Sequence, residues 1–255
     1  MNHELWHENK IAIVTGGTSG IGLEVARVLK QRGAVVAIGG RTPDNHQPLK
    51  DSGYLVAQLD VCSTESVEAF VGLVADTFGT PDILVNSAGV SVHHKVCDHS
   101  DEDWHSVIDT NLNGPFRMIR SCLPAMMNAK WGRIVNIAST AASTAVATHA
   151  AYCASKSGLL GLTRSVALEG AQSGVTCTSV SPTWVETEML RKSLSVMAKN
   201  SGRTIEEERK SIEAANPQNR LVQSSEIAEM VSFLCSDLSP ALTMEDIQIN
   251  AGAFW

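Results

Sequence analysis

The chain has 255 residues, of which 44% are hydrophobic and 18% charged, and 20 Lys and Arg against 27 Asp and Glu give a net charge of −7. This apolar fraction excludes intrinsic disorder, and the length suits one large domain with a buried core. No apolar run approaches the roughly 20 residues that cross a bilayer, and no basic cluster suits a nucleic-acid partner. Residues 1–10 lack the pattern of a secretory signal, so we expect a cytoplasmic protein without a membrane partner.

Six cysteines are scattered without a CxxC pair, which is typical of reduced, packed thiols. The segment 93–99 holds three histidines and one cysteine, which could suggest a metal site. Zinc sites draw their ligands from two separated pairs, and no second pair follows here. We therefore predict no metal.

Short apolar runs alternate with helical periodicity along the whole chain. Strands are expected at 11–15, 34–38, 55–61, 83–86, 133–139, 175–181 and 247–249. Helices are expected at 21–31, 63–78, 101–127, 149–172 and 224–235, with Ser63 capping the second. Strands separated by helices form parallel βαβ units with right-handed crossovers. The pattern predicts an α/β fold in a single domain over 1–255: a doubly wound parallel sheet (Rossmann fold) of about seven strands with helices on both faces.

Two segments depart from this rhythm. Residues 41–52 are polar and contain proline, which predicts a shortened crossover. Residues 183–220 form a long insertion, and such insertions at the carboxyl edge of a sheet lie where ligands bind, so we expect a substrate lid. Its apolar side chains either line a mainly apolar substrate pocket or pack the lid onto the body; the candidates are Trp184, Met189, Leu190, Leu194 and Met197.

A glycine-rich turn, Thr15-Gly-Gly-Thr-Ser-Gly-Ile-Gly22, joins the first strand to the first helix. Its glycines allow a tight turn and close backbone approach, and the helix N-terminus offers free N–H groups to a pyrophosphate. An ordinary turn is the alternative, but the place between first strand and first helix favours a dinucleotide site. The candidate cofactor residues here are Gly16, Thr18, Ser19, Gly20, Ile21 and Gly22.

The end of the second strand bears on the choice of cofactor. An acidic residue there would bind a ribose 2′-hydroxyl and repel a 2′-phosphate, but this chain has Gly39-Gly40-Arg41. The guanidinium of Arg41 favours NADP(H) over NAD(H), the alternative being a surface arginine in a loop. Asp60 and Val61, after the third strand, are expected to hold the adenine edge.

Tyr152 and Lys156 lie four residues apart on a predicted helix, so both project from one face, and Ser139 ends the strand just before it. A free tyrosine titrates near 10, and bringing it to about 7 takes about 4 kcal/mol. One cation about 4 Å away supplies roughly that much at an effective dielectric near 20. We therefore expect Lys156, helped by the charge of an oxidised nicotinamide, to make Tyr152 a proton donor and acceptor while Ser139 binds the substrate oxygen. Each residue alone has a plain structural explanation.

These motifs resemble the short-chain dehydrogenase/reductase family over nearly the whole chain. The resemblance rests on the turn 15–22, on Asn86-Ser87-Ala88-Gly89 and on a tetrad of Asn111, Ser139, Tyr152 and Lys156. It implies that Asn111 carries a water in the proton relay and that Lys156 also binds the nicotinamide ribose. It further implies cofactor contacts at Asn86, Ala88, Gly89, Pro182 and Thr187. The chain departs from the family pattern at Ser87, at Thr183 after Pro182, and at Asn250-Ala251-Gly252.

The expected substrate is a ketone or secondary alcohol, and several alternatives stay open. One is a 3-oxoacyl thioester reductase, although of two basic positions that grip an acyl carrier protein only Lys130 is basic here, the other being Ser173. Another is a nucleotide-binding sensor or scaffold without turnover, and a third is a lyase or epimerase. Family likeness also implies a homotetramer or homodimer paired through 101–127 and 149–172, with small apolar positions at Ala150, Ala154, Leu160 and Leu168.

Overall fold

The computed structural model describes residues 5–42 and 47–253. Within them seven parallel strands form one sheet in the order β3-β2-β1-β4-β5-β6-β7. The strands are β1 (Ile11–Thr15), β2 (Val35–Gly40), β3 (Leu55–Gln58), β4 (Ile83–Asn86), β5 (Gly132–Ile137), β6 (Val175–Pro182) and β7 (Asp246–Ile249). The strand order reverses between β1 and β4, which is where doubly wound sheets bind ligands. The predicted fold class is confirmed.

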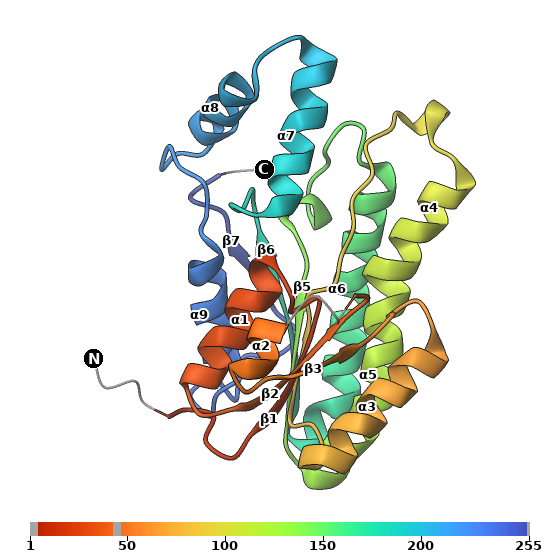
Figure 1. The fold of residues 1–255 in the computed structure, drawn as a ribbon, viewed down its shortest axis with the longest axis vertical. Coiled ribbons are helices and arrows are strands. Elements are labelled where there is room, and N and C mark those ends of the chain that lie inside the picture. Colours follow the sequence, from red (N-terminus) through yellow and green to blue (C-terminus); the bar gives the residue numbers. More distant parts are fainter. Residues whose placement is uncertain (1–4, 43–46, 254–255) are drawn as a thin grey trace.

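Helices cover both faces of the sheet, while α7 and α8 lie beyond the carboxyl ends of the strands (Figure 1). They are α1 (Gly20–Gln31), α2 (Gln47–Asp51), α3 (Thr64–Phe78), α4 (Asp101–Ile108), α5 (Gly114–Ala129), α6 (Ala150–Gly170), α7 (Glu188–Ser201), α8 (Ile205–Ala215) and α9 (Ser224–Leu234). Ala12 and Val14 of β1 pack with α1 and α9, whereas Ile13 packs with α3, α5 and α6. This alternation along one strand gives the sheet a core on each face. No helix in the described part of the chain is long and apolar enough to cross a membrane.

The expected helix over 101–127 is in fact interrupted. Between α4 and α5 the chain forms a π-helical segment, Asp109–Asn113, which inserts extra backbone into the helix. Periodicity did not predict it, because the apolar pattern continues on both sides. The strand expected at 55–61 is also shorter, since the Asp60 carboxylate accepts the Cys62 amide at 3.0 Å and turns the chain. Ser63 caps α3 as predicted, accepting the Ser66 amide at 3.1 Å.

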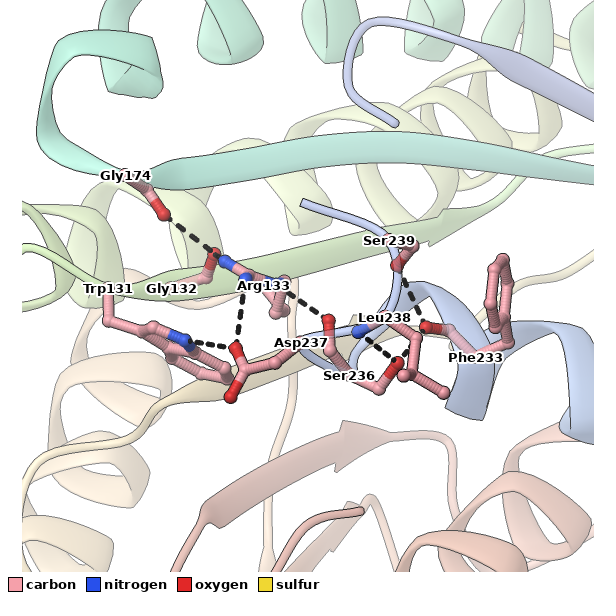
Figure 2. A network of polar contacts seen from close by, with 9 residues as sticks. All are labelled: Trp131, Gly132, Arg133, Gly174, Phe233, Ser236, Asp237, Leu238 and Ser239. Atoms are coloured by element: carbon pink, nitrogen blue, oxygen red, sulfur yellow. Dashed lines mark hydrogen bonds and ion pairs between the residues drawn. The ribbon is translucent and has the colours of Figure 1, made fainter. Parts of the chain in front are cut away.

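At the amino end of the sheet, the buried side chain of Arg133 on β5 fastens the segment that follows α9 (Figure 2). Its guanidinium donates to the carbonyl oxygens of Gly132 at 2.9 Å and Gly174 at 3.1 Å, and pairs with Asp237 at 3.3 Å. Trp131 donates to the same carboxylate at 2.9 Å. The network joins β5, the start of β6 and the chain after α9, far from the edge where ligands bind.

A chain of buried polar side chains crosses the middle of the sheet. Asn86 donates to Asn136 at 2.9 Å, Asn136 donates to Thr163 at 2.9 Å, and Thr163 bonds Ser179 at 2.8 Å. All four are at most 3% exposed, and they link β4, β5, α6 and β6. Because unpaired polar groups are costly in a core, these bonds fix where α6 lies against the strand ends.

Candidate active site

A cavity of about 410 Å³ lies at the carboxyl ends of the strands, between the turn after β1 and the start of α7. It brings together nearly all the residues proposed from the sequence. They are Gly16, Thr18, Ser19, Gly20, Ile21, Gly22, Arg41, Asp60, Val61, Ala88, Gly89, Ser139, Tyr152, Lys156, Pro182, Trp184, Thr187, Met189 and Leu190. One continuous cavity therefore spans the glycine turn, the Ser-Tyr-Lys group and the lid.

The glycine turn leaves no room for a side chain at Gly16 or Gly22. Gly16 has φ +63°, and a Cβ there would lie 2.8 Å from the Ala88 Cα, while a Cβ on Gly22 would lie 2.5 Å from the Gly16 oxygen. Ser19 is the N-cap of α1, and within the described residues its side chain makes no capping bond. The first N–H groups of this 12-residue helix therefore have no side-chain cap from Ser19. Uncapped N–H groups at a helix N-terminus suit a pyrophosphate.

Beside the glycine turn, the end of β2 holds the residues that were expected to decide between NADP(H) and NAD(H). Arg41 is exposed at its rim. Gly40 lies against the phosphate turn, since a Cβ there would meet the Thr18 methyl at 3.0 Å. Asp60 lines the cavity with one carboxylate oxygen already bonded to the Cys62 amide. Arg41 is therefore the cationic group that the end of β2 presents at the rim of the cavity.

Ser139, Tyr152 and Lys156 come from two neighbouring elements. Ser139 follows β5, and its hydroxyl accepts the Ala141 amide at 3.1 Å. Tyr152 and Lys156 lie one turn apart near the start of α6. The Lys156 Nζ donates to the Ile137 oxygen at 2.7 Å and lies 5.7 Å from the centre of the Tyr152 ring.

The electrostatics of this group differ from the sequence-based expectation. Burial raises the pKa of Tyr152, and a hydrogen bond with Ser139 acts in the opposite direction. Burial also lowers the pKa of Lys156, to about 8. The Lys156 ammonium is not among the causes that shift the Tyr152 pKa, and the ammonium donates a hydrogen bond to a backbone carbonyl instead. The sequence-based expectation of a lower Tyr152 pKa included the positive charge of an oxidised nicotinamide as well as that of Lys156.

Asn86 and Asn111, which were expected to contact the cofactor and a water, are not among the residues that line the cavity. Asn111 lies in the π-helical segment and is fully buried. Its amide brackets the backbone of Val90, accepting from the N–H and donating to the carbonyl at 2.9 Å each, and donates to Ser155 at 3.1 Å. Asn86 belongs to the buried polar chain. The Asn111 side chain thus holds the loop after β4 at Val90.

The lid combines both alternatives left open by the sequence. Trp184, Met189 and Leu190 line the cavity. Leu190 also packs with Leu194, Ile212 and Leu221 in an apolar cluster that Trp184 and Met197 adjoin. Some of these residues thus shape the pocket, while others hold α7 against α8.

His149 and Ser193 also line the cavity, and sequence reasoning did not select them. With His93 they come from three separate segments, so no local motif contains them. The one available signal was the spacing of His149, three residues before Tyr152, which places both on one side of a helix start.

A parallel doubly wound sheet that carries a glycine turn and a Ser-Tyr-Lys group on one cavity defines a dinucleotide-dependent oxidoreductase. Comparison with known proteins gives the family. Residues 16–253 match the family model described as enoyl-(acyl carrier protein) reductase. The chain belongs to this family of short-chain dehydrogenases/reductases, as its motifs indicated.

The chain is similar over almost its full length to curated members. It is 35% identical to a D-beta-hydroxybutyrate dehydrogenase of Rhizobium meliloti, covering 95% of this chain and 98% of the relative. It is 37% identical to the 3-oxoacyl-[acyl-carrier-protein] reductase of Escherichia coli, covering 97% and 98%. A solved structure of actinorhodin polyketide ketoreductase with NADPH is 37% identical, with a TM-score of 0.91 over 96% of this chain and 97% of the other.

Proposed function

We propose that this protein interconverts a ketone and a secondary alcohol, passing a hydride between NADP(H) and the substrate. The observation that carries the proposal is that Ser139, Tyr152 and Lys156 line the same cavity as the glycine turn after β1. The phosphate site and the proton-transfer group are thus close enough to serve one dinucleotide and one substrate. Relatives named as ketoacyl reductases and as a hydroxybutyrate dehydrogenase support this reaction class.

The residues at the phosphate end fit a dinucleotide. Gly16 and Gly22 have no space for a Cβ, and their bare backbone lies at the N-terminus of α1. Arg41, with Gly39 and Gly40 in place of a carboxylate, supports NADP(H) over NAD(H). The related ketoreductase structure was determined with NADPH, which supports the same cofactor.

A bound nicotinamide supplies the hydride for the carbonyl carbon in reduction and accepts it in oxidation. Tyr152 gives its phenol proton to the substrate oxygen as the C=O bond becomes C–OH, and Ser139 donates a hydrogen bond to that oxygen. Because burial raises the pKa of Tyr152, the phenol holds its proton at neutral pH. By family likeness, Lys156 binds the nicotinamide ribose.

Replacing Tyr152 tests the proposal. Tyr152→Phe removes only the hydroxyl, and we expect kcat with NADPH and a ketone to fall by about 10²- to 10⁴-fold, the usual contribution of a positioned acid. Tyr54→Phe is the matched control, since Tyr54 lies before β3 beside Lys30, outside the cavity. Consumption of NADPH is followed by absorbance. Equal rates for Tyr152→Phe and the parent protein would refute the mechanism and favour a dinucleotide-binding sensor.

A 3-oxoacyl thioester is the second candidate substrate, favoured by the identity of 37% to an acyl-carrier-protein-dependent reductase. The positions of Lys130 and Ser173 do not support an acyl carrier protein as a partner. They precede β5 and β6, at the opposite edge of the sheet from the cavity of the same chain, and Ser173 is buried. Comparing a 3-oxoacyl-CoA with the same acyl group on carrier protein distinguishes the two thioester substrates.

We further propose a homodimer or homotetramer paired through α5 and α6. Phe116 on α5 is 46% exposed and Leu168 on α6 is 66% exposed, while Leu160 is buried within the chain and is not available. Light scattering of Leu168→Lys tests this, because a charge at such an interface would release protomers. The cytoplasmic location stays a prediction.

A further inference from the structure

Three polar side chains from distant segments meet at the substrate end of the cavity. The His93 Nε2 and the Ser193 hydroxyl on α7 are 3.2 Å apart, within hydrogen-bond distance. The His93 ring packs edge-on against the His149 ring, with centroids 4.0 Å apart. The His149 ring centre is 6.4 Å from that of Tyr152. The lid, the loop after β4 and the start of α6 thus hold one imidazole near the proton donor.

The hydrogen bonds of His149 determine which nitrogen is free. Its Nδ1 lies 2.9 Å from the Ala147 carbonyl oxygen. A carbonyl only accepts, so the tautomer that fits this contact has its proton on Nδ1, which leaves the lone pair on Nε2. Over residues 5–42 and 47–253 no partner bonds Nε2, yet the side chain is only 8% exposed and lines the cavity. A buried imidazole therefore presents an unused hydrogen-bond acceptor to the substrate space.

The charges around the cavity indicate a neutral substrate. Among the described residues, Arg41 and Asp60 lie at the ends of β2 and β3, and the Lys156 ammonium bonds Ile137. The Glu188 carboxylate pairs with Lys192 at 2.9 Å. Burial lowers the pKa of His93 to about 4, so this ring is neutral at physiological pH. Apart from the Lys156 ammonium, which bonds Ile137, no lysine or arginine among the described lining residues lies at the substrate end of the cavity.

We propose that His149 is a substrate-specificity residue, whose Nε2 accepts a hydrogen bond from a hydroxyl group on a neutral ketone. This inference rests on the proposed ketone reduction and names the substrate class within it. The donor lies on a carbon near the carbonyl, since Tyr152 and His149 are neighbours. His93 is a positioning residue, fixed by Ser193 and packed on the imidazole.

Three ketones of similar size separate this role from simple packing. They are 4-hydroxybutan-2-one, which has a donor; 4-methoxybutan-2-one, which has only an acceptor; and pentan-2-one, which has neither. We expect kcat/KM to favour the hydroxyketone by about fivefold over each of the others, the value of one neutral hydrogen bond. His149→Leu should bring both ratios close to one, His149→Gln should keep them because an amide oxygen still accepts, and Val146→Ala in the same wall should also keep them.

The outcomes distinguish a failure of the role of His149 from a failure of the proposed function. Ratios close to one in the parent protein, or ratios that His149→Leu leaves unchanged, would overturn the role of His149 while ketone reduction stands. A preference for a 3-oxo carboxylate over all three neutral ketones would also overturn it. If the parent protein reduces none of the ketones with either nicotinamide, the proposed function itself fails. Dinucleotide binding, measured by fluorescence, shows that each variant is folded.

Discussion

The two ends of the cavity are built in different ways. At the cofactor end, glycines of a single turn after β1 contribute bare backbone to the wall. At the substrate end the wall is made of side chains that come from the loop after β4, the start of α6 and the lid. A local sequence can specify the first end but not the second. This is why the sequence could select the residues of the glycine turn, whereas it did not select the His93–His149–Ser193 cluster.

The largest effect on dinucleotide affinity should come from adding one methyl group at the cofactor end. In Gly16→Ala the new Cβ lies 2.8 Å from the Ala88 Cα at φ +63°, so the turn must shift. We expect dinucleotide affinity to fall by about 100-fold or more, roughly 3 kcal/mol. Gly72→Ala in α3 is the control, because nothing lies within 4 Å of a Cβ there. Titration with NADPH measures both, and an unchanged Gly16→Ala would break the contrast between the two ends.

Lys156→Met should separate activity from stability. The substitution should abolish most of the turnover. It should also stabilise the cofactor-free protein by about 1 to 3 kcal/mol below pH 8, because folding then no longer buries a charged ammonium. The pKa of this lysine falls from 10.5 unfolded to about 8 folded, so the unfolded chain binds more protons between these values. The gain should therefore shrink as the pH rises from 8 toward 10.5.

Urea unfolding over that pH range tests this expectation, with the exposed Lys199→Met as control. A stability gain that did not change with pH would contradict the explanation by burial.

A smaller change is expected at the rim. Arg41→Ala should weaken NADP(H) by about tenfold and NAD(H) much less, because only the former carries a 2′-phosphate. Arg41 is exposed, so the difference should decrease at high salt. Dissociation constants for both dinucleotides at two salt concentrations measure this. Equal losses for the two cofactors would remove the role assigned to Arg41.

The smallest effect should come from the lid. Ser193→Ala removes the hydrogen bond to His93, and we expect the KM for 4-hydroxybutan-2-one to rise by about two- to threefold while that for NADPH is unchanged. Ser195→Ala, on the exposed side of the same helix, is the control. A rise in both KM values would mean that Ser193 stabilises the whole lid rather than the imidazole cluster.

The sequence predicted the strands and the phosphate turn, because buried parallel strands and a glycine turn each have a local pattern. It did not predict the π-helical segment Asp109–Asn113, since a helical pattern of apolar residues continues on both sides of that segment, in α4 and α5. It selected Asn86 and Asn111 by family likeness but not the direction of their side chains. That direction depends on partners such as Val90 and Asn136, which only the folded chain brings near.

The polar chain through the sheet limits how this sequence can diverge. Asn136 both accepts from Asn86 and donates to Thr163, and Thr163 in turn bonds Ser179. An apolar replacement at one position would leave the polar groups of its neighbours buried without hydrogen-bond partners. Viable substitutions should therefore arise in concert, and a library randomised at all four positions together should yield folded members that single-site libraries lack.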